Sequence, residues 1–128
     1  QSKLANLLFM FELGRRAPDV LSVACHPGYS STNLLGAEAK ESGSRLREAF
    51  WGWTNATIAQ SSHAGALPTV YAAVKQGLSS GDYVGPSGPF EIVGAPKRVR
   101  VAKKARDPEV AARLWALSEE LTGEPFAL

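Results

Sequence analysis

The chain of 128 residues has little of what defines several protein classes. Its single cysteine excludes an internal disulfide and a cysteine-rich metal site, and is typical of a reducing, cytoplasmic compartment. No apolar run approaches the ~20 residues that span a bilayer, so we expect no membrane span. Charge of one sign is scarce too, because 14 Lys and Arg against 12 Asp and Glu leave a net charge of +2. That small excess gives no reason to expect a nucleic-acid partner.

The residues that are present suit a folded domain that begins with a helix. Hydrophobic residues make up 45% and charged residues 20% of the chain, as in ordinary globular domains. A helix is predicted over residues 4–17, where the apolar residues have the spacing of one helix face. These residues are Leu4, Leu7, Leu8 and Phe11. The helical pattern is already under way at Gln1 and no Met precedes it, which suggests that the chain is part of a longer domain.

A short apolar run follows over residues 20–25 and ends at His26-Pro27-Gly28. Such a run is typical of a strand buried on both faces, the kind found in parallel sheets. Residues 83–85, 90–93 and 99–101 are shorter strand-like pieces between glycines and prolines. One convincing strand and a few weak ones cannot form a stable parallel sheet alone. We therefore expect an α/β fold that is incomplete within these residues.

Two more helices are predicted in the second half of the chain. The first covers residues 60–76, with a serine cap at its start, and Pro68 lies deep enough in it to predict a kink or a later start of the helix. The second begins at the cap Asp107 and Pro108, and Gly123 ends it. Its expected buried stripe consists of Val110, Leu114, Leu117 and Leu121.

Three motifs in order resemble those of one enzyme family. Ser2-Lys3-Leu4-Ala5-Asn6 opens the first helix, and Pro27-Gly28-Tyr29-Ser30-Ser31-Thr32 follows the apolar strand. Ser80-Gly81-Asp82-Tyr83 lies further along. Together they resemble the C-terminal half of the short-chain dehydrogenase/reductase (SDR) family, in particular its retinol dehydrogenase and WW-domain oxidoreductase branches. The resemblance implies part of a single dinucleotide-binding domain over residues 1–128: the C-terminal half of a Rossmann-type, doubly wound parallel sheet in three layers, αβα.

The resemblance also implies a reaction, a cofactor and the residues that serve them. The reaction is hydride transfer between NAD or NADP and an alcohol or carbonyl substrate. Lys3 would be the motif lysine, binding the nicotinamide ribose and assisting a tyrosine that lies upstream of these residues. Pro27, Gly28, Tyr29 and Thr32 would bind the cofactor. Because the motif tyrosine, the catalytic serine and the glycine-rich loop are not among these residues, the chain by itself is expected to be inactive.

The remaining expectations concern substrate and partners. Phe50, Trp51 and Trp53 lie where the family has its variable substrate lid, and a lipophilic substrate, ordinary lid packing or a partner interface would each explain them. Family members commonly pair through helices that match residues 4–17 and 60–76, which predicts a homodimer or homotetramer. No metal is expected.

A rival function comes from a basic stretch near the end of the chain. Residues 97–106 contain six Lys or Arg and no acid. They would suit a non-catalytic binding or dimerisation module that meets phosphates. A solvated edge strand protected by its charges is the simpler explanation.

Overall fold

The computed structural model describes residues 1–28 and 61–126. The elements in these ranges, in chain order, are α1 (Ser2–Arg16), β1 (Ala24–Cys25), α4 (Ser62–Val74), β2 (Tyr83–Pro86), β3 (Pro96–Arg98) and α5 (Pro108–Thr122). Two short 3-10 turns, Pro89–Glu91 and Lys103–Arg106, connect the later elements.

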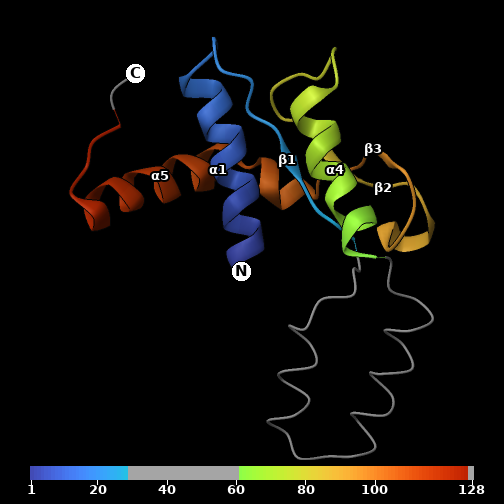
Figure 1. Cartoon of the computed structure of the whole chain (residues 1–128). Coiled ribbons are helices and arrows are strands. Elements are labelled where there is room, and N and C mark those ends of the chain that lie inside the picture. The colour runs from blue at the N-terminus through green and yellow to red at the C-terminus, as the bar shows by residue number, and fades with distance from the viewer. Residues whose placement is uncertain (29–60, 127–128) are drawn as a thin grey trace, which may run out of the picture.

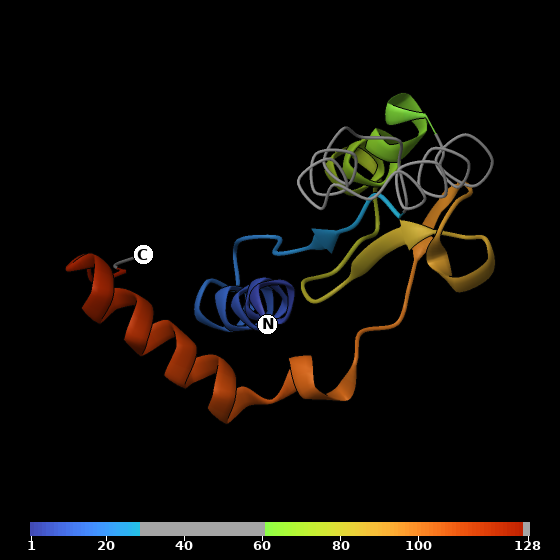
Figure 2. The same ribbon diagram turned by 90° about the horizontal axis from the view of Figure 1, so that it is seen from below.

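The three strands form one mixed sheet in the order β1-β2-β3. β1 and β2 are parallel, with Cys25 opposite Val84, and β3 is antiparallel to β2, with Lys97 opposite Gly85. Figure 2 shows α4 on one side of the sheet and α1 on the other, with α5 outside α1. The α/β class and the layered arrangement are confirmed, and the antiparallel β3 adds an edge to the parallel pair.

The first helix is confirmed with slightly different ends, and of its predicted apolar face only Leu8 is fully buried. Leu8 and Met10 are buried, and so is the carboxylate of Glu12, which pairs with two arginines one turn later. The core continues through the later elements at Val84, Val101, Ala105, Ala111 and Trp115. Because these residues come from both halves of the chain, α1 is the element around which the described part packs.

The caps of α5 are confirmed, but its predicted inner face is wrong. The Asp107 carboxylate accepts hydrogen bonds from the amides of Glu109 and Val110, and Gly123 ends the helix with a φ of 72°. The stripe residues are largely exposed, 50% for Leu117 and 78% for Leu121. The buried face carries Ala111 and Trp115 instead, because α5 crosses α1 with that side inward (Figure 1).

The strand predictions hold only in part. In the run 20–25 only Ala24–Cys25 forms a strand, and it is half-buried because only β2 pairs with it in the described residues. Residues 90–93 are not a strand, since Phe90 and Glu91 have positive φ and belong to a 3-10 turn. β3 precedes the predicted piece 99–101, of which Val99 still donates its amide to the Tyr83 carbonyl at 2.8 Å.

Helix α4 begins where its cap predicts. The Ser61 hydroxyl accepts a hydrogen bond from the Ala64 amide, and the helix runs through Pro68 as one element. Two of its apolar residues are largely exposed, Val70 at 52% and Val74 at 72%. Gly65 and Pro68 are the buried residues, because a small residue and a flat ring allow the helix to lie close to the sheet.

Within residues 1–28 and 61–126, no helix combines the length and apolar character needed to cross a membrane.

Candidate functional site

The predicted cofactor-binding residues that the structure describes lie at one end of the molecule. Pro27 and Gly28 follow the carboxyl end of β1, and Lys3 lies in the first turn of α1. Because α1 and β1 run in opposite directions, the amino end of the helix and the carboxyl end of the strand lie on the same, lower side of Figure 1. Ligands of open α/β sheets bind at the carboxyl ends of the strands, so this end is the candidate site.

Gly28 is required by the fold at this position. Its φ is +69°, in the region that favours glycine, and a Cβ there would lie 2.3 Å from the Ile92 carbonyl oxygen and 2.7 Å from Pro86. The sequence suggested a glycine that lets a ligand approach the backbone. The structure shows a glycine that lets the turn after β2 approach the turn after β1.

His26 connects these two turns. Its Nε2 lies 3.2 Å from a carboxylate oxygen of Glu91, and its Nδ1 accepts the Gly28 amide hydrogen at 3.3 Å. Its ring also lies against that of Tyr83, with 5.1 Å between the ring centres. The sequence analysis missed Glu91, which is 65 residues away from His26 and carries no motif.

Two more titratable side chains lie close by in the chain or in the sheet, Tyr83 on β2 and Cys25 on β1. Burial raises the pKa of the Tyr83 phenol, and the negative charge of Glu91 raises it further. The phenol therefore stays protonated at neutral pH. Cys25 is a free, half-buried thiol whose Sγ lies 3.4 Å from the hydroxyl of Thr69 on α4.

Lys3 is exposed and makes no ion pair with any residue of the ranges 1–28 and 61–126. The other predicted site residues lie outside these ranges. They are the cofactor-binding Tyr29 and Thr32 and the lid residues Phe50, Trp51 and Trp53. Their roles stay predictions. No group of three or more metal-ligating side chains is found in the described part of the chain.

The basic stretch 97–106 is partly engaged within the chain. Arg98 pairs with Asp82 at 3.0 Å and donates to the Gly77 carbonyl, while Lys97 donates to the Ser87 carbonyl at 3.3 Å. The Arg106 guanidinium lies over the Phe11 ring at 5.8 Å. Half of the six charges therefore hold β3 and the following turn in place, which does not favour a phosphate-binding surface.

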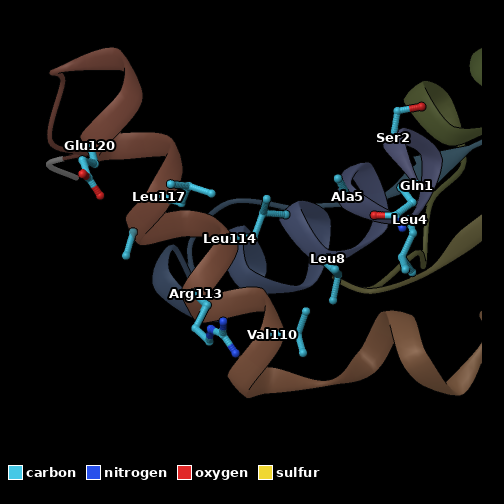
Figure 3. A pocket seen from close by; sticks show the side chains of 11 residues that line it. Gln1, Ser2, Leu4, Ala5, Leu8, Val110, Arg113, Leu114, Leu117 and Glu120 are labelled. Carbon is cyan, nitrogen blue, oxygen red and sulfur yellow. The ribbon is translucent and has the colours of Figure 1, made fainter.

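A separate apolar groove of about 880 Å³ lies between α1 and α5. Leu4 and Leu8 line it from one helix and Val110, Leu114 and Leu117 from the other (Figure 3). None of the predicted site residues lines it. It is an uncovered packing surface among the described residues, and its end at Gln1 and Ser2 adjoins the first turn of α1.

Known proteins resemble the chain over nearly its whole length. Human retinol dehydrogenases 13 and 12 are 37% and 32% identical to it, and mouse polyprenol dehydrogenase is 35% identical. These matches cover 95–96% of this chain but only 34–35% of each relative. A crystal structure of an uncharacterised protein from Mycobacterium Paratuberculosis is 38% identical, with a TM-score of 0.66 over 100% of this chain and 39% of that one. No protein-family profile matches.

The named relatives are short-chain dehydrogenases/reductases. The chain is related to the SDR family. It spans about a third of the length of the curated relatives that it matches. The SDR resemblance that the motifs predicted is thereby confirmed.

Proposed function

We propose that this chain is the C-terminal part of an NAD(P)-dependent SDR oxidoreductase that moves hydride between nicotinamide and an alcohol or carbonyl carbon. The relationship to retinol and polyprenol dehydrogenases over 95–96% of the chain carries this proposal. The geometry supports it, because the lysine end of α1 and the Pro27-Gly28 turn face the same side of the molecule. We further propose that the 128 residues alone are inactive.

The described residues fit the nicotinamide end of such a cofactor. The Pro27-Gly28 turn offers backbone groups at the carboxyl end of a parallel strand, and Lys3 offers an ammonium at the same end of the molecule that makes no ion pair within residues 1–28 and 61–126. The chain contains no Gly-x-Gly-x-x-Gly sequence, so the phosphates would be held by residues outside it. When bound, the nicotinamide accepts or delivers the hydride.

Lys3 has two tasks in this proposal. Its Nζ would donate a hydrogen bond to a ribose hydroxyl of the bound cofactor and so help to orient the nicotinamide. Its positive charge also lowers the pKa of a phenol one helical turn earlier, as the family resemblance implies, because a nearby cation favours the phenolate. That phenol would exchange a proton with the substrate oxygen in the reaction that the family resemblance implies.

The substrate class that we propose is a lipophilic alcohol or its carbonyl form. Two relatives are named for retinol and one for polyprenol, both of them lipophilic alcohols. Phe50, Trp51 and Trp53 would supply apolar surface for such a substrate. Replacing Trp51 or Trp53 by Ala should raise KM for a long-chain alcohol more than for a short one.

The test begins with the coding sequence upstream of Gln1. It should encode a tyrosine four positions before Lys3 and a glycine-rich loop near its start. In the full-length protein, Lys3→Ala should weaken NAD(P)H binding and slow hydride transfer, measured by cofactor fluorescence and single-turnover kinetics. Lys104→Ala, which removes an exposed charge elsewhere, is the matched control. A gene without both upstream features, or unchanged rates in Lys3→Ala, would contradict the proposal.

Assembly and location stay predictions. A homodimer or homotetramer through α1 and α4 is compatible with the exposed Leu67, Val70 and Val74 on α4. Light scattering of the full-length protein measures its mass in solution. A cytoplasmic location rests only on cysteine usage.

A further inference from the structure

The imidazole of His26 is half-buried and has close neighbours on β2 and on the 3-10 turn after it. A Cβ on Gly85 of β2 would lie 2.1 Å from its Nε2, so the ring lies directly over the Gly85 backbone. Tyr83, two residues earlier on the same strand, flanks the ring, and Glu91 faces Nε2. A side chain placed so closely by β2 and by the 3-10 turn has little rotational freedom left.

The partners of the two ring nitrogens specify the tautomer. The Glu91 carboxylate is only an acceptor, so Nε2 carries the hydrogen. Nδ1 then has a lone pair, and it accepts the Gly28 amide hydrogen. Glu91 therefore favours the tautomer that carries its hydrogen on Nε2. In that tautomer Nδ1 can accept the Gly28 amide hydrogen.

The backbone that carries Glu91 is strained. Phe90 and Glu91 have φ values of 53° and 58°, a region that residues other than glycine rarely adopt. The turn is closed by the Gly88 amide, which donates to the Val93 carbonyl at 2.9 Å, and its Ile92 carbonyl packs against Gly28. Strain of this kind persists where the surrounding structure requires it, commonly next to a functional site.

We propose that His26, held by Glu91, is a positioning residue that fixes the Pro27-Gly28 peptide for nicotinamide binding. In a trans peptide the N–H and the preceding C=O point to opposite sides. Directing the Gly28 amide toward Nδ1 therefore also sets the direction of the Pro27 carbonyl. This inference rests on the proposed function, because it assigns a task to the turn at which the nicotinamide would bind.

The variants that test it separate the two hydrogen bonds of the ring. His26→Leu removes both. His26→Asn keeps an oxygen that can accept the amide two residues on, as in an Asx turn, but does not reach Glu91. Glu91→Ala removes the carboxylate, and Glu91→Gln returns an acceptor for the Nε2 hydrogen. Glu124→Gln, on the exposed segment after α5, is the matched charge control.

The measurement is the affinity of the full-length protein for NADH and NADPH, compared with that for ADP-ribose or its 2′-phosphate, which lack nicotinamide. His26→Leu should weaken binding of the reduced cofactor about tenfold, equivalent to about 1.4 kcal/mol, with adenine-side binding unchanged. His26→Asn should recover most of that loss, and Glu91→Gln should bind more tightly than Glu91→Ala. KM for the cofactor should rise more than kcat falls.

Each contrary result has a distinct meaning. A wild-type protein that binds neither cofactor overturns the proposed function, and this inference with it. If the wild-type protein binds the cofactor and His26→Leu binds it equally well, the inference is wrong and the proposed function stands. A parallel loss of ADP-ribose binding in His26→Leu also overturns it, because general loosening of the fold would then explain the effect. Nitrogen-15 shifts of the His26 ring give a readout without activity, and a proton on Nδ1 at neutral pH would contradict the scheme.

Discussion

At the scale of single residues, the described structure is stabilised by a few buried side chains that have specific partners. Glu12 is 1% exposed and binds Arg15 and Arg16, with contacts of 2.5 Å and 2.7 Å. The hydrogen bond from Arg15 lowers the pKa of this carboxyl against the opposing effect of burial, and Arg16 lowers it further. The ion pair thus lets a carboxylate lie inside α1's packed face.

Acid should therefore destabilise the protein through Glu12. A lowered pKa in the folded state gives stability that is complete above the unfolded value of about 4.3 and is lost as pH falls through the folded value. We expect Glu12→Gln to be less stable than wild type at neutral pH and to lose less stability on acidification. Urea unfolding at several pH values measures this, with the exposed Glu120→Gln as control. Equal pH dependence in wild type and Glu12→Gln would argue against the assignment.

Two glycines with similar positive φ allow the cost of backbone strain to be separated from the cost of a steric clash at Cβ. Gly28 and Gly77 have φ of +69° and +79°, but only Gly28 has neighbours that a Cβ would meet. Gly77→Ala should cost about 1 kcal/mol of unfolding free energy, the ordinary penalty of a left-handed alanine. Gly28→Ala should cost roughly 2 kcal/mol more, because the Ile92 carbonyl must move. Equal losses in chemical denaturation would show that the two turns are not in contact.

At the scale of elements, the boundary signals were predictable and the buried faces were not. Asp107, Pro108 and Gly123 define α5 through contacts within a few residues, which a sequence displays directly. The buried face of α5 depends on where α1 lies, and this contact joins residues that are far apart in the sequence. Trp115 stacks on Phe9 at 5.2 Å and meets Phe126 edge-on at 4.9 Å, while the more regular leucine stripe stays exposed.

Trp115 should therefore contribute much more to stability than the leucine stripe. Trp115→Ala removes the ring that Phe9, Phe126 and the Arg16 guanidinium contact, and should cost about 3–5 kcal/mol. Leu121→Ala, at a side chain 78% exposed, should cost less than about 0.5 kcal/mol if nothing covers it in the full-length protein. A larger loss in Leu121→Ala would show that another part of the protein covers this side of α5.

In the candidate site too, residues marked by a local sequence pattern were predictable and a residue brought in by the fold was not. Pro27 and Gly28 were predictable, because a buried apolar run that ends in Pro-Gly marks the carboxyl end of a strand. Glu91 was not, since its approach to His26 depends on a strained turn after β2. The same strain explains why residues 90–93 form a turn although their composition favours a strand.

At the scale of the whole molecule, the sheet has one edge at β1. The amides of Ala24 and His26 donate to the carbonyls of Asp82 and Val84 on the β2 side. Because successive amides of a strand point to alternate edges, the Cys25 amide points away from β2. In the structure described, no strand of the ranges 1–28 and 61–126 lies there.

The proposed Rossmann-type sheet predicts that this edge is paired in the full-length protein. The Cys25 amide should then exchange with deuterium about as slowly as those of Ala24 and His26, because a further strand would accept its hydrogen bond. Residue-resolved hydrogen exchange measures this, and the exposed Lys104 amide gives the fast reference. Fast exchange at Cys25 alone would mean that the sheet ends at β1.

The close approach of Gly85 to the imidazole of His26 also constrains how relatives of this protein can diverge. With 2.1 Å between a Cβ at position 85 and Nε2, a side chain on β2 and an imidazole on the neighbouring turn exclude each other. The two positions are therefore expected to change together across evolution. Lineages that keep the histidine should keep glycine opposite it, and lineages that gain a side chain there should have lost the ring.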